Sequence, residues 1–334
     1  MPYNKDIDKY SFLITGGAGF IGSNLVEYLL NNNAGKVRVL DNFSTGHYAN
    51  IDFFRSNPAF ELIEGDIRDL DTCRRAVEGI NYVAHQAALG SVPRSINDPI
   101  TTNEVNINGF LNMLVASRDA KVKRFVYAAS SSTYGDSKAL PKEEDKIGKP
   151  LSPYAITKYV NELYADIFSK MYGIETIGLR YFNVFGRRQD PKGAYAAVIP
   201  KFVMQFIAHE SPVINGEGDY SRDFTYIDNV IQMNILAMTT TNEKAINTVY
   251  NTAVGDRTTL NQLTSYLKEF LSEYDPAIAD IAVKHTDYRV GDIPHSLASI
   301  KKAEKMLGYK PSHKIKEGLG EAVKWYWANL VDKQ

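Results

Sequence analysis

Tyr154 and Lys158 stand four residues apart, which places their side chains on one face of an α-helix. Ser152 suits the N-cap of that helix and Pro153 suits its first turn, so we predict a helix over residues 154–172. The pKa of a free tyrosine is about 10, and a nearby ammonium with a second positive charge lowers it. The spacing favours a phenolate that removes a proton from an alcohol, although an exposed Tyr–Lys pair has the same pattern.

A glycine-rich turn follows the apolar run 11–15, which we interpret as a buried strand. Gly16, Gly19 and Gly22 have the spacing of a dinucleotide-binding turn, and so does the set that begins with Gly17. The residues that follow are apolar at helical spacing, so strand, turn and helix come in the required order. This context predicts that a pyrophosphate lies at the helix N-terminus, close to the backbone of the turn.

Asp41 ends the second predicted strand, about 20 residues after Gly22. An acid there accepts hydrogen bonds from the adenosine ribose and repels a 2′-phosphate, so we predict NAD rather than NADP. The loop over residues 42–46 has no basic residue for such a phosphate. Asp66 is expected either to meet the adenine or to cap a helix. Other residues that we assign to the cofactor site are Phe20, Ile21, Asn42, Ser44, Thr45, Gly46, Ile67, Gln86, Ala87, Ala88 and Asn106.

Four hydroxyl side chains, Ser130 to Thr133, follow the predicted strand 124–128. Ligands of open α/β sheets bind at the carboxyl ends of strands, so Ser130 is placed to bond a substrate alcohol together with Tyr154. A serine-rich turn without function is the alternative reading of this stretch.

Strand and helix patterns alternate as far as residue 180, which predicts an α/β fold with a doubly wound parallel sheet. We expect residues 1–180 to form a dinucleotide-binding Rossmann domain to which residues 226–252 return. Residues 181–225 and 253–334 are expected to form a smaller C-terminal α/β substrate domain. Within that region, residues 222–228 alternate like one strand that leads into a helix.

This combination of motifs resembles the extended short-chain dehydrogenase/reductase superfamily, from residue 11 to about residue 327. Within it the chain is similar to the UDP-hexose 4-epimerases, above all to the bacterial branch that acts on UDP-N-acetylglucosamine and UDP-N-acetylgalactosamine for surface polysaccharides. Related dehydratases carry an Asp-Glu pair in the turn 130–133, and related decarboxylases carry a Glu. The turn has no acid in this chain, as an epimerase requires.

The resemblance implies that tightly bound NAD takes a hydride from C4 of a UDP-linked sugar and returns it to the opposite face. Tyr154 is then the base, Lys158 lowers its pKa, and Ser130 orients the hydroxyl. Ser296 matches a position where epimerases restricted to plain hexoses carry tyrosine, so its small side chain leaves room for an N-acetyl group. The residues matched to the substrate site are Ser91, Ser130, Ser131, Ser132, Tyr154, Asn183, Ala197, Val198, Asn215, Arg222, Arg289, Asp292 and Ser296.

Several alternatives stay open at this point. Plain UDP-glucose and UDP-galactose, or the uronic-acid sugars, are rival substrates. A net dehydrogenase would consume free cofactor, and a non-catalytic NAD-sensing protein would share the fold but tends to lose the tyrosine or the lysine. The resemblance also implies a homodimer through the helices near Asn106 and Tyr154.

The totals exclude other classes of protein. The 38 basic and 39 acidic residues give a formal net charge of −1, which argues against a nucleic-acid partner or a polybasic membrane surface. The single cysteine, Cys73, forms no disulfide within the chain, and residues 1–10 have no apolar signal core, so we expect a cytoplasmic protein. No apolar run has the length of a membrane span, and the six histidines have no metal-binding spacing, so we predict no metal site.

Overall fold

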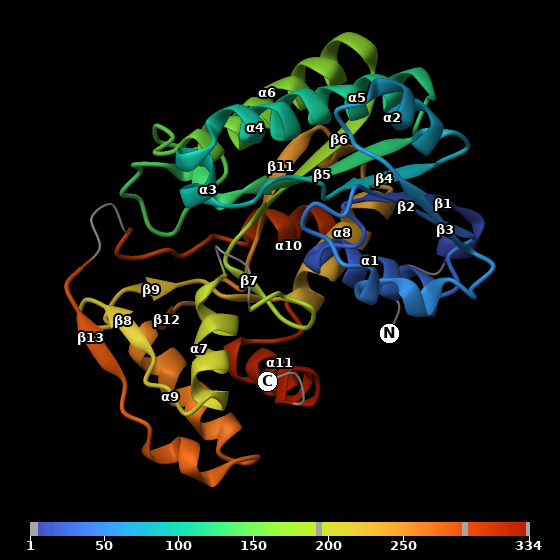
Figure 1. Cartoon of the computed structure of the whole chain (residues 1–334). Coiled ribbons are helices and arrows are strands. Elements are labelled where there is room, and N and C mark those ends of the chain that lie inside the picture. Colours follow the sequence, from blue (N-terminus) through green and yellow to red (C-terminus); the bar gives the residue numbers. More distant parts are fainter. Residues whose placement is uncertain (1–5, 192–195, 289–292, 332–334) are drawn as a thin grey trace.

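The computed structural model describes residues 6–191, 196–288 and 293–331. Seven parallel strands form its central sheet: β1 (Ser11–Thr15), β2 (Lys36–Asp41), β3 (Phe60–Glu64), β4 (Tyr82–His85), β5 (Arg124–Ser130), β6 (Glu175–Tyr181) and β11 (Thr248–Thr252). Their order is β11-β6-β5-β4-β1-β2-β3 (Figure 1). This order confirms the predicted doubly wound sheet. Because the strand order reverses between β1 and β4, their carboxyl ends form the switch point where such sheets bind ligands.

Helices cover both faces of this sheet (Figure 1). On one face lie α2 (Leu70–Val77), α5 (Phe110–Asp119) and α6 (Pro153–Tyr172), with the short helices α3 (Val92–Asn97) and α4 (Pro99–Asn103) beside α6. On the other face lie α1 (Phe20–Asn31) and α8 (Ile227–Thr239). Alternate residues of β1 supply the two cores, since Leu13 packs with α2, α5 and α6, whereas Phe12 and Ile14 pack with α1 and α8.

The predicted helix around Tyr154 forms as expected. The Ser152 hydroxyl accepts a hydrogen bond from the Ala155 N–H at 3.1 Å, and Pro153 occupies the first turn. Gly173 ends α6 in the left-handed conformation, with φ of 72°. The segment expected as a helix from residue 106 instead begins with a turn of π-helix, Glu104–Gly109, which continues into α5.

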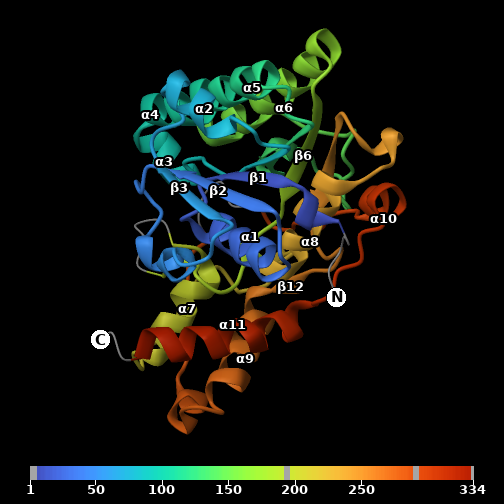
Figure 2. The same cartoon turned by 90° about the vertical axis from the view of Figure 1, so that its right-hand side faces the viewer.

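A second layer of elements lies below α1 and α8 in Figures 1 and 2, at one end of the sheet. Three helices there pack against one another: α7 (Val198–Ile207), α9 (Leu260–Leu271) and α11 (Ile315–Leu330). Three two-stranded sheets accompany them: β7 (Val184–Phe185) with β10 (Thr225–Tyr226), β9 (Ser221–Arg222) with β12 (Thr258–Thr259), and β8 (Val213–Asn215) with β13 (Lys284–Thr286). The short helix α10 (Lys301–Leu307) packs instead on β11 of the central sheet.

Residues 222–228 do not form the single strand that their alternation predicts. They divide into the ends of β9 and β10, and α8 begins at Ile227. The break falls at Asp223, whose buried carboxylate accepts backbone N–H bonds from Val254, Gly255 and Ala298. Because the Asp223 carboxylate accepts three N–H groups from two other segments, residue 223 cannot occupy a position in one continuous strand. Among the described residues, no helix is both long and apolar enough to cross a membrane.

Candidate active site

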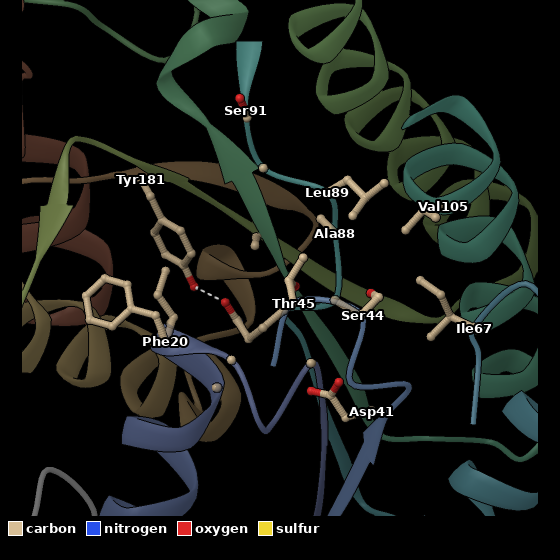
Figure 3. Close-up of a pocket in the computed structure, with 18 of the residues that line it drawn as sticks. Phe20, Asp41, Ser44, Thr45, Ile67, Ala88, Leu89, Ser91, Val105 and Tyr181 are labelled. Atoms are coloured by element: carbon tan, nitrogen blue, oxygen red, sulfur yellow. Dashed lines mark hydrogen bonds between the residues drawn. The ribbon is translucent and has the colours of Figure 1, made fainter. Parts of the chain in front are cut away.

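A cavity of about 550 Å³ opens at the carboxyl ends of β1, β2, β4 and β5. Side chains from the start of α1, the end of β2, the loop that follows β2 and the end of β6 surround it in Figure 3, and α6 adds Tyr154 and Lys158. It brings together these predicted residues: Gly16, Gly19, Phe20, Ile21, Gly22, Asp41, Asn42, Ser44, Thr45, Asp66, Ile67, Gln86, Ala87, Ala88, Ser91, Ser130, Tyr154, Lys158 and Asn183. Residues separated by half of the chain therefore share one cavity.

The glycine turn has the shape of a phosphate cradle. Gly16 has φ of +66°, a conformation that glycine adopts without strain. A Cβ atom on Gly22 would lie 2.2 Å from the Gly16 carbonyl oxygen, so only glycine lets the first turn of α1 pack on the loop. These constraints leave the α1 N-terminus open toward the cavity, where its backbone N–H groups suit a pyrophosphate.

Asp41 presents a carboxylate to the same cavity. One oxygen accepts the Ala18 N–H and the other accepts the Phe43 N–H, both at 2.8 Å. Burial raises the pKa of Asp41, although these backbone bonds oppose the rise. Each carboxylate oxygen can accept a further hydrogen bond, so the two acceptors fit the ribose hydroxyls of NAD.

Asp66 lies at the cavity beside Asn42, whose side-chain amide donates to it at 2.8 Å. The side chain of Arg68 bonds the Asp66 carboxylate, and this lowers the pKa of Asp66 to about 2. The cap of α2 is Asp69 instead, which accepts the Thr72 N–H. Of the two roles expected for Asp66, the helix cap is therefore wrong.

Tyr154 and Lys158 lie on the cavity side of α6, opposite Ser130 at the end of β5. The Lys158 ammonium donates to the Ala128 carbonyl at 2.9 Å and lies 5.9 Å from the centre of the Tyr154 ring. Burial lowers the pKa of Lys158 to about 8. The position of these groups on one helix face is the one that the spacing predicted.

The electrostatics of Tyr154 differ from the prediction. Burial raises its pKa, and the opposing influence is a side-chain hydrogen bond with Ser130 rather than the charge of Lys158. The ammonium is directed at a backbone carbonyl and is not in contact with the phenol oxygen. The surroundings of Tyr154 therefore favour the neutral phenol, and the Ser130 bond is the contact that opposes this.

A second tyrosine, Tyr181, lines the cavity from the end of β6 and was not predicted there (Figure 3). Its hydroxyl donates to Gln86 at 3.0 Å and accepts from the Asn234 amide at 2.9 Å. The Gln86 amide in turn donates to Asn234 at 3.1 Å, which closes a ring of three hydrogen bonds. Burial raises the pKa of Tyr181 strongly, so this phenol is a wall of the cavity and is poorly suited to be the base.

Other lining residues also escaped sequence analysis: Leu40, Gly65, Leu89, Gly90, Val105, Ala128, Ala129, Val184 and Gln189. Most of them are small or apolar and give no chemical signal. For all of them except Ala128 and Gln189, the available clue was a position directly beside a predicted residue.

Some predicted residues lie outside this cavity. Asn106 connects a lining residue of the cavity to α6, because its amide oxygen accepts the Leu89 N–H and its nitrogen donates to Thr157 of α6. Gly46 packs against Ala18 and Asp41. The remaining predicted residues among those described that do not line the cavity are Ser131, Ser132, Ala197, Val198, Asn215, Arg222 and Ser296. Arg289 and Asp292 lie outside the described residues.

Arg222 and Ser296 are neighbours in the second layer. The Ser296 N–H donates to the Ser221 carbonyl at 3.0 Å, and the Arg222 guanidinium donates to the Pro294 carbonyl at 3.2 Å. His295 bonds the Ser221 hydroxyl at 2.9 Å. The segment from residue 293 is thus fixed along β9, next to a guanidinium of the kind that binds phosphate.

No group of three or more metal-ligating His, Cys, Asp or Glu side chains occurs within the described part of the chain. His85 is buried, stacks on Phe125 and bonds Thr15 at 2.9 Å. Burial lowers the pKa of His85 to about 3, so it is a neutral packing residue.

Comparison with known proteins supports the same interpretation. Residues 12–253 match the model of the NAD dependent epimerase/dehydratase family. The structure resembles the UDP-N-acetylglucosamine 4-epimerase of Methanobrevibacter ruminantium, solved with UDP-N-acetylmuramic acid, with a TM-score of 0.89, 38% identity and coverage of 96% and 99% of the two chains. It also resembles the UDP-glucose 4-epimerase of Thermotoga maritima, solved with UDP-glucose, with a TM-score of 0.87, 36% identity and coverage of 96% and 99%. The UDP-glucose 4-epimerase of Mycolicibacterium smegmatis is 31% identical over 94% of this chain and 97% of its own length.

The Asp41 geometry predicts how the cofactor is selected. Asp41→Asn replaces one acceptor oxygen by an amide that faces a backbone N–H, and it removes the charge that repels a 2′-phosphate. We expect affinity for NADH to fall about tenfold and the preference for NADH over NADPH to shrink, as measured by fluorescence titration. Glu64→Gln, at the end of the neighbouring strand β3, is the matched control and should leave both affinities unchanged. Unaltered discrimination in Asp41→Asn would contradict the assignment.

Proposed function

The chain belongs to the NAD dependent epimerase/dehydratase family, and we propose that it interconverts UDP-N-acetylglucosamine and UDP-N-acetylgalactosamine at C4. One observation carries the proposal: a Tyr–Lys pair suited to proton transfer lines the same cavity as a dinucleotide cradle. An enzyme that oxidises and then reduces one sugar carbon needs both in one place. Similar proteins whose names specify C4 epimerisation of UDP-linked sugars support the reaction class.

Each group at the cavity has a defined part in this reaction. Tyr154 accepts the proton of the sugar 4-hydroxyl and later returns it, and Ser130 orients that hydroxyl through its bond to the phenol. Lys158 holds positive charge close to the phenol while its ammonium is fixed by the Ala128 carbonyl. When bound, NAD supplies the hydride acceptor, which is positively charged in its oxidised form. No water or acid group leaves the substrate, which agrees with a turn 130–133 that has no carboxylate.

We assign NAD to residues 1–180 with residues 226–252, and the nucleotide sugar to residues 181–225 and 253–334. Two features support this division. β11 pairs with β6 in the main sheet, and α8 packs on that sheet, so residues 226–252 belong with the cofactor. The guanidinium of Arg222 lies in the second layer, where it suits the diphosphate of UDP.

The N-acetylated sugars are proposed because of Ser296. It is small, it lies beside Arg222, and its backbone is tied to β9. Plain UDP-hexoses are the second candidate, supported by the similarity to UDP-glucose 4-epimerases. The product would supply surface polysaccharide assembly. A reducing cytoplasm is proposed because Cys73 is the single cysteine of the chain and forms no disulfide within it.

We also propose that the protein is a homodimer, with α6 at the interface. One stripe of apolar side chains runs along α6, and each side chain is about half exposed or more: Ile156, Leu163, Ile167 and Met171. Ile96 and Ile100 on the adjacent α3 and α4 extend it. A continuous apolar stripe of this kind is uncommon on a monomer, and a second copy related by a two-fold axis would present the same surface.

The role of Tyr154 is tested by Tyr154→Phe, with Tyr181→Phe as a control in the same cavity. We expect Tyr154→Phe to lose turnover by about 10³-fold because the proton acceptor is gone, while the purified protein still contains NAD. Tyr181→Phe should lose far less, since its hydroxyl is held by Gln86 and Asn234. Turnover is measured by separating the C4 epimers. Normal turnover in Tyr154→Phe, with loss in Tyr181→Phe, would reverse the two roles.

Sugar selection is tested with Ser296→Tyr. We expect the bulkier side chain to reduce turnover of the N-acetylated pair by about 100-fold and to spare UDP-glucose and UDP-galactose. Ser296→Ala keeps the space and should resemble the parent enzyme. The parent enzyme is incubated with the four UDP-sugars and with UDP-glucuronate, and the nicotinamide absorbance is followed to detect net oxidation. Turnover of the plain or uronic sugars alone would refute the proposed substrate.

The proposed interface predicts the effect of a charge on α6. Ile167→Glu should convert the dimer to a monomer in sedimentation equilibrium, because it places a carboxylate in the buried apolar stripe. Val213→Glu places the same charge at a partly exposed apolar residue on the distant strand β8, and it should leave the dimer intact. A parent protein that sediments as a monomer at micromolar concentration would rule out this interface.

A further inference from the structure

The loop 186–190 follows β7 and lies between the cofactor cavity and the outer side of α1. Gln189 lines the cavity, and its amide donates to the Val184 carbonyl at 3.1 Å. The two preceding residues turn away from the cavity toward α1. Arg188 has φ of +66°, a left-handed conformation that is costly for a residue with a side chain, so its surroundings must hold it there.

Glu27 of α1 holds both arginines of this loop. Its carboxylate bonds Arg188 at 2.6 Å and Arg187 at 3.4 Å. The Arg188 side chain is only 8% exposed and also donates to the Ser23 hydroxyl at 3.1 Å. Burial alone would raise the pKa of Glu27, but the two guanidinium groups outweigh burial and lower it, so the carboxylate is charged at neutral pH.

Further bonds fix the same loop on three elements. The Asn24 amide of α1 donates to the Arg187 carbonyl at 3.0 Å. The Arg187 guanidinium donates to Asp228 of α8 at 2.7 Å. The hydroxyl of Tyr326, on α11, donates to the Gly186 carbonyl at 3.1 Å. The loop is therefore anchored along its length, although it has no regular secondary structure.

The far end of the loop meets the opposite rim of the cavity. Ser44 and Thr45 form that rim and line the cavity (Figure 3). Two residues further on, His47 lies 3.6 Å from the Asp190 carboxylate. The Arg188 guanidinium also lies over the ring of Phe53, in the same rim segment, at 5.9 Å. Contacts thus run from α1 through the loop to the 44–55 segment, and both the loop and that segment supply lining residues of the cavity.

We propose that residues 186–190 are a strap that retains NAD between turnovers, and that Glu27 is the positioning residue that pins the strap to α1. The proposal rests on the proposed function only in that an epimerase reuses one cofactor molecule. NAD leaves when the strap lifts from α1, so weakening its anchor raises the dissociation rate of NAD. The anchor faces away from the groups that transfer protons.

The test measures release of NAD, not turnover. The protein is loaded with NAD labelled in the adenine, chased with excess unlabelled NAD, and sampled over time on desalting columns. Glu27→Gln keeps the shape of the side chain and removes the charge, and we expect release at least tenfold faster. In dilute assays this variant should also come to depend on added NAD.

Glu61→Gln is the matched control. Glu61 on β3 likewise holds two cations, Lys36 at 2.7 Å and Arg38 at 2.8 Å, and it lies away from the strap, although its side chain is 38% exposed against 26% for Glu27. We expect its release rate to equal that of the parent protein. Equal acceleration by both variants would overturn the proposal, because it would reveal a general loss of stability.

Two more variants cover the case in which Glu27→Gln does not fold. Arg188→Lys keeps one bond to Glu27 and should release NAD at an intermediate rate. His47→Asn removes the contact at the far rim and should also accelerate release. Parent-like release in both would overturn the strap. A protein that binds NAD but epimerises none of the sugars would refute the proposed function and leave this comparison of release rates valid.

Discussion

The structure depends on the burial of an ammonium group and a phenol side by side at the end of β5. Burial lowers the pKa of Lys158 to about 8 and raises that of Tyr154, so the cavity drives both groups toward their neutral forms. Proton removal from an alcohol needs the opposite state, a phenolate close to an ammonium. The Ser130 bond stabilises the first and the Ala128 carbonyl stabilises the second. Oxidised NAD carries a positive charge, so its binding beside Tyr154 would favour the phenolate.

An ion pair one turn further along α6 fixes Tyr154 and Lys158 in position relative to the sheet. Glu162 follows Lys158 by four residues and bonds Arg180 of β6 through both oxygens, at 2.9 and 2.7 Å. The Arg180 guanidinium also lies 4.9 Å from the ring of Tyr134, which follows the serine turn of β5. A buried bidentate pair tolerates little sliding, so α6 cannot shift along β6 without leaving a charge unpaired. The outer face of α6 is then free to carry the apolar stripe.

Sequence analysis succeeded where function is built from backbone geometry within a short stretch. The glycine turn, Asp41 and the capped helix of Tyr154 are local patterns, and all of them meet at the cavity. It failed where a residue acts through a partner far along the chain. Gln86 and Tyr181 gave no signal of their shared partner Asn234, and Glu27 gave none of Arg188. The break of the 222–228 strand at Asp223 was missed for the same reason, since its partners lie in the segments around residues 254 and 298.

The proposed reaction places opposite demands on the two sides of the cavity, because the sugar must turn over while NAD stays. The cofactor side is rigid: it consists of strand ends, a glycine turn and an anchored loop. The sugar side is assembled from short strands and from the segment after residue 292, which Ser221 and Asp223 hold mainly through backbone bonds. Burial raises the pKa of Asp223 to about 7, so keeping its carboxylate ionised while it bonds the Ala298 N–H costs free energy. Because the Ser296 backbone is tied to β9 and the strap is pinned to α1, substitutions near Ser296 are expected to change which sugar fits without loosening NAD, and substitutions in the strap are expected to loosen NAD without changing the sugar.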